Sequence, residues 1–283
     1  MEVTELILRP AGMFSNVNEV VQQLYLAERS GYQFIIDWSA SCYRSSQRKT
    51  DPWNYYFEDC FPDVNSGSKS LRQIPFGTPV ACSKNNIITP REIDGNCVPL
   101  LLPKNRELPH RFIKSNINLK KALKDRISKL VSVNFSERTI GLHIRGSGRR
   151  DGGSSQQRSQ NNGKYGIPFK RYFKHVDAYL LKHPEAKIFI CSDSLLVIRK
   201  VMLRYGEKVI TYQATRSEFG EMHVAGQPEN SGSTFPKYKL GEDVIIETYM
   251  LSKTNYFIHG NSNVVNFVLC KNPHLPNQYI YCD

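Results

Sequence analysis

Residues 139–153, TIGLHIRGSGRRDGG, place an arginine at the end of a short apolar run. The run predicts a buried strand, and parallel strands deliver their last residues to the sheet edge where α/β proteins bind ligands. The planar guanidinium of Arg145 fits phosphate oxygens, and Gly146 and Gly148 allow a ligand to approach the backbone. His143 lies two residues earlier, so it leaves the strand on the same face. The alternative is a surface arginine in an ion pair, beside a buried histidine.

Polar residues also follow the next apolar run, in FICSDS. Asp193 would lie at the same sheet edge as Arg145 and could contact the same ligand. Aspartate and serine at this position are also frequent N-caps of a following helix. Ser192, Asp193 and Ser194 therefore fit either a binding site or a cap.

Glu247 lies in the segment EDVIIETYMLS, which predicts a helix over residues 242–252. Its helical neighbours include Val244, Met250 and Leu251. Because a carboxylate among apolar residues destabilises the fold unless it is paired, either an arginine neutralises Glu247 or it faces a ligand cleft.

The run HGNSNVVNF follows a further predicted strand. Ser262 and Asn263 would begin a helix there, and free N–H groups at a helix N-terminus bind anions. An ordinary N-cap explains the same residues. Together with Arg145, Asp193 and Glu247, they would lie at the carboxyl ends of strands in one half of the chain. That shared location indicates a nucleotide or sugar-nucleotide site.

The first forty residues must supply the opposite wall of such a site. They predict a strand over residues 3–8, a turn containing Gly12, and a helix that starts near Asn16 with Glu19 as its capping partner. Gly31 ends this helix, and YQFIID predicts the next strand. A glycine turn between a first strand and helix faces the ligand crevice of α/β sheets.

The remainder of the chain alternates in the same way. Strands are predicted over residues 139–144, 187–191, 208–212 and 255–260, and helices over 118–133, from Pro168, from Leu195 and over 242–252. The fold class is therefore α/β, with two Rossmann-like domains, residues 1–134 and 135–283, that face a central cleft. Residues 38–118 give no clear order of elements, although the aromatic run at 51–61 indicates a short helix or turn.

Composition narrows the class of protein. A chain of 283 residues with 40% hydrophobic residues is globular, and no apolar run is long enough to span a membrane. The net charge of +12 suits a polyanionic partner. Basic clusters interleaved with exposed aromatics, which would indicate a nucleic-acid-binding protein, are missing, so nucleic acid is not an expected partner.

The N-terminal sequence MEVTELILRP lacks the features of a signal peptide. Seven cysteines at irregular spacings, with no CxxC, favour reduced thiols in the cytoplasm and no zinc site. A secreted form with three disulfides is the alternative, if a leader has been removed.

At this point the chain resembles the fucosyltransferase superfamily, which includes the rhizobial nodulation fucosyltransferase, the α1,6-fucosyltransferases and the protein O-fucosyltransferases. GLHIRGSGRRD resembles the H-x-R motif of this superfamily, and IFICSDSLLVIRKVMLRYG resembles its strand–Asp–helix motif. GEDVIIETYMLSKTNYFIHGNSNVVNF resembles the third motif, and GMFSNVNEVVQQLYLAERSGYQFIID the opening glycine loop and helix.

The resemblance implies a GT-B glycosyltransferase that inverts the transferred sugar carbon and needs no metal or other cofactor. The usual donor of the family is GDP-fucose, transferred to a hydroxyl of a glycan. The N-terminal domain would bind the acceptor and the C-terminal domain the donor. Arg145 would hold the donor β-phosphate and stabilise the leaving diphosphate. The donor pocket would also include Gly12, His143, Gly146, Asp193, Ser194, Glu247, Ser262 and Asn263. The sequence has no D-x-D motif for a metal ion, in keeping with an expected absence of metal ligands.

Two departures from the family pattern leave alternatives open. The residues after H-x-R are GSGRRDGG, so the general base is Asp151, Asp37 or Glu19, unless the leaving phosphate accepts the proton. Glu247 replaces the more frequent aspartate, so the donor is a GDP-sugar or a UDP-sugar such as UDP-xylose. Such a short chain resembles soluble enzymes of bacteria or large algal viruses. A sugar-nucleotide or glycan binder without catalytic activity is the remaining alternative.

Overall fold

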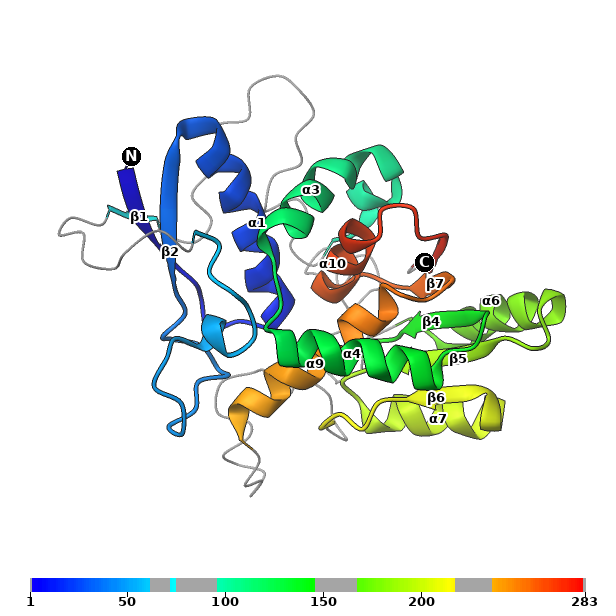
Figure 1. The fold of residues 1–283 in the computed structure, drawn as a ribbon. Coiled ribbons are helices and arrows are strands. Elements are labelled where there is room, and N and C mark those ends of the chain that lie inside the picture. Colours follow the sequence, from blue (N-terminus) through cyan, green and yellow to red (C-terminus); the bar gives the residue numbers. More distant parts are fainter. Residues whose placement is uncertain (1, 62–71, 75–95, 146–166, 217–235, 282–283) are drawn as a thin grey trace.

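The structure is a computed structural model, and it describes residues 2–61, 72–74, 96–145, 167–216 and 236–281. Its described strands form two parallel sheets, of three and five strands (Figure 1). In this part of the chain no helix is both long and apolar enough to cross a membrane.

The first sheet has the strand order β2-β1-β3, with β1 at Glu2–Ile7, β2 at Tyr32–Asp37 and β3 at Arg72–Ile74. Helix α1, Met13–Ser30, connects β1 to β2. Its apolar stripe, which includes Val17 and Val20, is buried. Gly31 ends the helix at a φ of 70°, in the left-handed region that favours glycine. The predicted strand–helix–strand unit is thus confirmed.

The predicted start of α1 is wrong by three residues. The helix begins at Met13, and Asn16 already lies inside its first turn. The Asn16 side chain instead donates hydrogen bonds to the carbonyls of Arg9 and Ala11, each at 3.1 Å. Glu19 is buried in the helix, where it accepts a hydrogen bond from Gln23. Asn16 therefore ties the β1–α1 loop to the helix rather than capping it.

The second sheet has the strand order β6-β5-β4-β7-β8, and all its neighbouring strands are parallel. Its strands are β4 at Thr139–His143, β5 at Lys187–Cys191, β6 at Val209–Thr211, β7 at Tyr256–His259 and β8 at Asn277–Tyr279. Four of them were predicted and β8 was not. The order reverses between β4 and β7, and α/β sheets bind ligands where this reversal occurs.

Helices cover both faces of this sheet. On one face lie α6, Phe169–Lys182, and α7, Leu195–Tyr205. On the other lie α4, Lys121–Asn134, α9, Lys237–Leu251, and α10, Asn263–Lys271. Alternate residues of β5 point to the two faces: Ile188 and Ile190 pack under α6 and α7, while Phe189 and Cys191 join the opposite core.

Three further predicted helix starts differ from the structure. Helix α4 begins at Lys121, three residues after the predicted residue 118. Pro168 precedes the first turn of α6 at the N-cap position instead of lying inside it. Helix α9 begins at Lys237, before the predicted residue 242, because the polar start YKLG also adopts helical conformation.

The described part of residues 38–118, which the sequence could not order, contains β3 and four short helices. They are η1 at Pro52–Tyr55, η2 at Val98–Leu101, η3 at Pro103–Asn105 and α3 at Glu107–Asn116. The 3₁₀ helix η1 confirms the short helix expected in the aromatic run, and its Trp53 and Tyr55 are buried. A further 3₁₀ turn, η4 at Gly206–Lys208, leads into β6.

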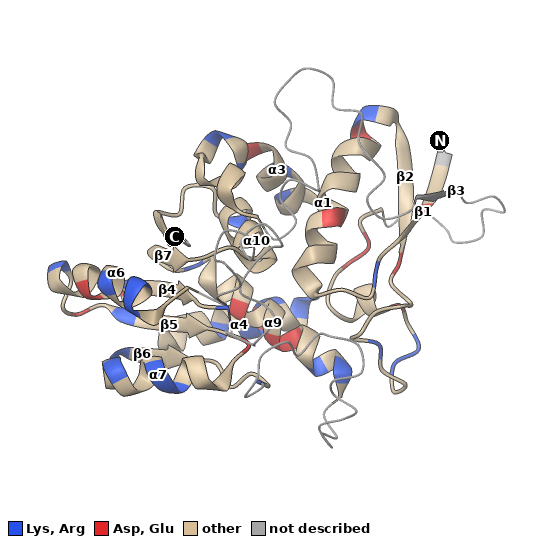
Figure 2. Cartoon of the chain, turned by 180° about the vertical axis from the view of Figure 1, so that it is seen from behind, with Lys and Arg blue, Asp and Glu red and all other residues tan. Residues whose placement is uncertain are grey.

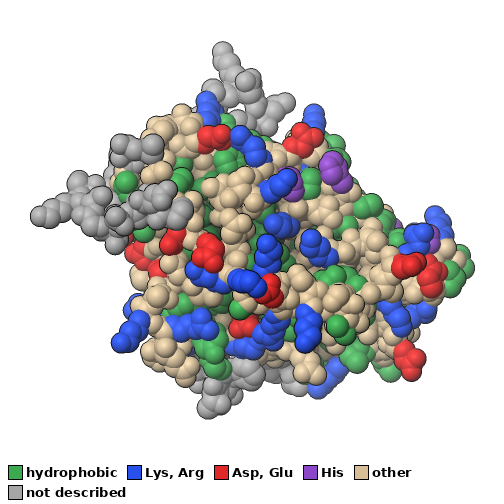
Figure 3. Space-filling view, viewed as in Figure 1, with side chains coloured by type: hydrophobic (Ala, Val, Ile, Leu, Met, Phe, Trp, Pro, Cys, Tyr) green, Lys and Arg blue, Asp and Glu red, His purple; other side chains and the backbone are tan. Residues whose placement is uncertain are grey.

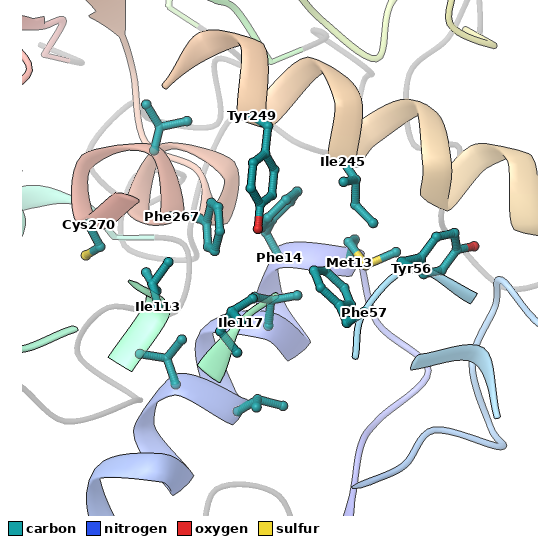
Figure 4. Close-up of a cluster of buried hydrophobic side chains, with 14 of the residues drawn as sticks. Met13, Phe14, Tyr56, Phe57, Ile113, Ile117, Ile245, Tyr249, Phe267 and Cys270 are labelled. Atoms are coloured by element: carbon teal, nitrogen blue, oxygen red, sulfur yellow. The ribbon is translucent and has the colours of Figure 1, made fainter. Parts of the chain in front are cut away.

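A single apolar core joins the two halves of the chain. Side chains of α1, α3, α9 and α10 meet in it (Figure 4), and the rings of Phe14 and Phe267 lie 4.7 Å apart between centroids. Asn18 on α1 donates a hydrogen bond to the carbonyl of Asn263 at 3.1 Å. The two sets of strands fall on either side of residues 134 and 135, but the helices share this core, so the domain boundary stays a prediction.

Candidate active site

A cavity of about 600 Å³ lies between the β1–α1 loop and the carboxyl ends of the strands in the second sheet. The start of α1 forms one wall, and α9 and the start of α10 form another (Figure 1). Seven of the predicted site residues line it: Gly12, His143, Arg145, Asp193, Glu247, Ser262 and Asn263. Residues from both halves of the chain thus meet where the strand order predicts a ligand.

Two other predicted site residues, Ser194 and Asp37, lie outside the cavity lining. Ser194 is buried at the start of α7, where its N–H donates to Ser192 Oγ at 3.1 Å. Asp37 ends β2 outside the cavity lining, and its Oδ1 accepts a hydrogen bond from the Ser39 N–H at 2.8 Å. Gly146 and Asp151 lie outside the described residues.

The strand β4 brings His143 and Arg145 to the cavity. His143 is buried, and its burial lowers the pKa of the imidazole to about 3. The charges of Asp193 and Arg145 act on that pKa in opposite directions. His143 is therefore neutral near pH 7, and its ring offers a ligand one donor and one acceptor rather than a charge.

We expect the His143 and His259 imidazoles to stay neutral between about pH 5 and 8. Burial lowers the pKa of His259 to about 4, compared with about 3 for His143. Because an unfolded histidine titrates near 6.5, each group contributes stability above that pH, which is lost as the pH falls toward the folded value. NMR spectra of the ring protons will test this, with free histidine as the titrating reference. Titration of either ring near 6.5 would contradict the structure.

Among the described residues, two helices begin at the cavity wall, and a third begins just beyond it. The first N–H of α1, on Met13, donates to the Tyr43 hydroxyl at 3.0 Å. Helix α10 is capped by Ser262, whose Oγ accepts from the Val264 N–H at 3.1 Å. Helix α7 follows Ser192 and Asp193, which line the cavity. Helix N-termini carry partial positive charge, so their convergence favours an anionic ligand.

Glu247 is paired with an arginine that sequence analysis did not identify. The Arg216 guanidinium donates to both carboxylate oxygens, with Nη1 3.4 Å from Oε2. Both side chains are 6% exposed. The Cys191 thiol donates to the same Oε2 at 3.3 Å. The two alternatives for Glu247 are therefore combined, since it is neutralised by Arg216 and also lines the cavity.

Arg216 also holds in place the segment after β6, which forms part of the cavity wall. Its guanidinium donates to the Ser192 carbonyl, and to the Tyr212 carbonyl at 2.9 Å. These bonds connect the ends of β5 and β6 to α9 through Glu247. The need for a cation near Glu247 was visible in the sequence, but nothing in the sequence distinguishes Arg216 from the other arginines.

A second buried carboxylate, Asp243, supports the same wall. It accepts hydrogen bonds from the Tyr212 hydroxyl and Lys239 ammonium, both at 3.1 Å, and from the Thr215 N–H at 2.9 Å. Like Glu247, it lines the cavity. Two carboxylates of the lining are thus balanced by Arg216 and Lys239, so they do not repel an incoming anion as unpaired charges would.

The turn that carries Ser262 is held by Cys97, a residue that the sequence did not single out. The Cys97 N–H donates to Asn261 Oδ1 at 3.0 Å, and its thiol donates to the same oxygen at 2.9 Å. Cys97 is completely buried. The five cysteines in the described part of the chain are free thiols: Cys42, Cys60, Cys97, Cys191 and Cys270. Cys97 thus positions the start of α10 through Asn261.

The two parallel sheets, with a cavity at the carboxyl ends of the second, define a GT-B fold. Solved fucosyltransferase structures share it. NodZ α1,6-fucosyltransferase soaked with GDP-fucose matches with a TM-score of 0.54 and 16% identity, over 95% of this chain and 92% of that one. NodZ from Bradyrhizobium matches at 0.53 and 17%, over 98% and 94%. FUT1 from Arabidopsis thaliana, in complex with GDP, matches at 0.53 and 9%, over 99% and 70%.

Sequence comparison gives no further assignment. No family model matches the chain, and no curated protein matches it. The likeness to the fucosyltransferases is therefore one of fold. What the chain binds must be argued from its own cavity.

Proposed function

We propose that this chain is a glycosyltransferase that transfers a sugar from a GDP-sugar to a hydroxyl of a glycan. The observation that carries the proposal is the cavity of about 600 Å³ in which Arg145 and the starts of α1 and α10 converge. Such a site suits a diphosphate. The same fold occurs in NodZ soaked with GDP-fucose, which supports GDP-fucose as the first donor to test.

The proposed reaction is a direct displacement that inverts the sugar carbon. Arg145 would neutralise the charge that develops on the leaving diphosphate, and the helix N-termini would add to that effect without a metal ion. The neutral His143 beside it would orient the donor by a hydrogen bond. Asp151 and the leaving phosphate stay the predicted proton acceptors, since Asp37 and Glu19 lie outside the cavity lining.

The first test is the thermal stability of the protein with GDP, UDP and their common sugar conjugates, in the presence of EDTA. A ligand at about 100 times its Kd adds about 2.7 kcal/mol to the free energy of unfolding, which raises the melting temperature by several degrees. We expect GDP and GDP-fucose to stabilise the protein and UDP to have little effect.

Each other result changes the proposal in a defined way. Selective stabilisation by UDP would keep Arg145 as the phosphate ligand but assign a UDP-sugar donor, with UDP-xylose tested next. Stabilisation only without EDTA would show that a metal ion is required. Binding of GDP-fucose without transfer to any glycan would assign a binding protein. No stabilisation by any nucleotide would overturn the proposal.

A further inference from the structure

The outer surface of α6 and α7 combines positive charge with exposed leucines. The two helices have fourteen and eleven residues, and together they contain seven Lys or Arg and a single acidic residue, Asp177. They thus supply six of the twelve excess positive charges of the whole chain. Blue segments of the ribbon mark the Lys and Arg positions of both helices in Figure 2.

The same surface holds an unusual share of exposed apolar side chains. Eight large hydrophobic residues are exposed in the described part of the chain, and four of them lie on these two helices. Leu203 is 90% exposed, Leu181 85%, Leu196 52% and Met202 47%. Single exposed leucines are ordinary, but several close together on one surface indicate a binding face.

The spacing on α7 brings the two kinds of side chain together. Leu196 and Leu203 are seven residues apart and share one side of the helix, with Arg199 and Lys200 between them in sequence. The helices α6 and α7 are in contact, since Tyr205 donates a hydrogen bond to Asp177 at 2.9 Å. Their exposed sides therefore form one continuous layer.

Several charges on the opposite face of the molecule form ion pairs. There Lys120 pairs with Glu58 at 2.6 Å, and Lys121 pairs with Asp125. Blue side chains lie beside red ones on that face (Figure 3). On α6 and α7 the single acidic residue, Asp177, pairs with Arg204 at 2.6 Å, and the net charge of the two helices is +6.

We infer that the outer face of α6 and α7 docks on an anionic lipid surface. Leucine side chains gain free energy by entering the boundary between headgroups and acyl chains, while lysine and arginine bind the anionic headgroups. A nucleic acid would satisfy the charges but not the leucines, because it requires exposed rings for stacking. The rings of Phe169 and Phe173 are instead packed together, with centroids 5.8 Å apart. This inference does not depend on the proposed function.

The test is co-sedimentation of the full chain with vesicles of phosphatidylcholine alone or mixed with phosphatidylserine. We expect binding to the mixed vesicles only. Lys174→Gln with Lys200→Gln should weaken it by about 30-fold, since each cation near an anionic surface contributes about 1 kcal/mol. Leu196→Gln with Leu203→Gln should weaken it by about tenfold or more.

Matched variants control for charge and for apolar area. Lys114→Gln with Lys129→Gln changes the net charge equally at exposed positions outside the layer, and Leu102→Gln removes a leucine that is 55% exposed elsewhere. Both should bind like the unaltered protein, and circular dichroism will show that all variants are folded.

Several results would overturn the inference. One is equal binding to both kinds of vesicle, and another is no binding to either. A third is an equal loss of vesicle binding in the variants of α6 and α7 and in the control variants. Self-association that only the leucine variant abolishes would assign the face to a second copy of the chain. Oligonucleotide binding that both layer variants lose, without vesicle binding, would assign it to nucleic acid.

Discussion

Replacing Arg145 by alanine is expected to lower sugar transfer by about 10²–10³-fold, which is the usual loss when a donor to a developing negative charge is removed. Arg145 lines the cavity just after β4, so its removal should affect the leaving diphosphate rather than the fold. The measurement is the rate of transfer at saturating donor, together with the melting temperature of the variant.

Arg138 provides the matched control for Arg145. It precedes the opposite end of the same strand, where its exposed side chain pairs with Glu185 at 3.3 Å. Arg138→Ala should therefore keep near-normal transfer. Arg145→Lys should fall between the two, because lysine retains the charge but loses the planar fork. Near-normal transfer by Arg145→Ala would contradict the assigned role.

Replacing Arg216 by alanine should lower the free energy of unfolding by about 3–5 kcal/mol near pH 7, because it leaves a buried carboxylate without its partner. Both Arg216 and Glu247 are 6% exposed, so water cannot replace the lost cation. Urea unfolding of the variant and the unaltered chain at one pH measures the effect. A loss below about 1 kcal/mol, the value typical of exposed pairs, would show that the pair contributes little.

The pH dependence of that loss gives a second, independent check. Burial raises the pKa of Glu247, and Arg216 counteracts part of this rise. Without Arg216 the folded pKa rises further above the unfolded value, so the folded variant binds a proton that the unfolded chain does not. Its stability therefore increases as the pH falls. We expect a smaller loss at about pH 5 than at about pH 8.

The control for Arg216 is a more exposed ion pair that also involves a glutamate of α9. Arg126 forms an ion pair with Glu242 of α9, but its side chain is 44% exposed. Arg126→Ala should cost no more than about 1 kcal/mol. Its stability loss should also change little with pH compared with that of Arg216→Ala. If Arg126→Ala lowered the free energy of unfolding as much as Arg216→Ala, burial would not explain the contribution of the Arg216 pair to stability.

The sequence was sufficient to predict most of the second sheet, because its strands are short apolar runs bounded by polar turns. It missed β8, whose residues Asn277–Tyr279 are polar and pair at the sheet edge. It also misplaced the start of α1, since Asn16 resembles an N-cap but bonds to the preceding loop. Side-chain partners of this kind depend on tertiary structure and leave no periodic pattern.

Part of the candidate site was also predictable, because the strands that carry its residues could be located in the sequence. Residues at strand ends, such as Arg145 and Ser262, share one sheet edge, so topology alone brings them together. Arg216, Asp243 and Cys97 reach the site through contacts across the fold, and their local sequences give no signal. Asp193 belongs to the site rather than to the cap, because the N-cap residue of α7 is Ser194 and Asp193 lines the cavity.

The hydrogen bond between Asn18 and Asn263 joins residues 245 positions apart, and it bears on how the protein is made. Helix α1 leaves the ribosome before α10, which packs against its apolar side. At about 5–20 residues per second, roughly 12–50 s separate their synthesis. For that time Phe14 and its neighbours lack the partner ring of Phe267. During that interval the apolar side of α1 that α10 covers in the folded protein stays without this partner.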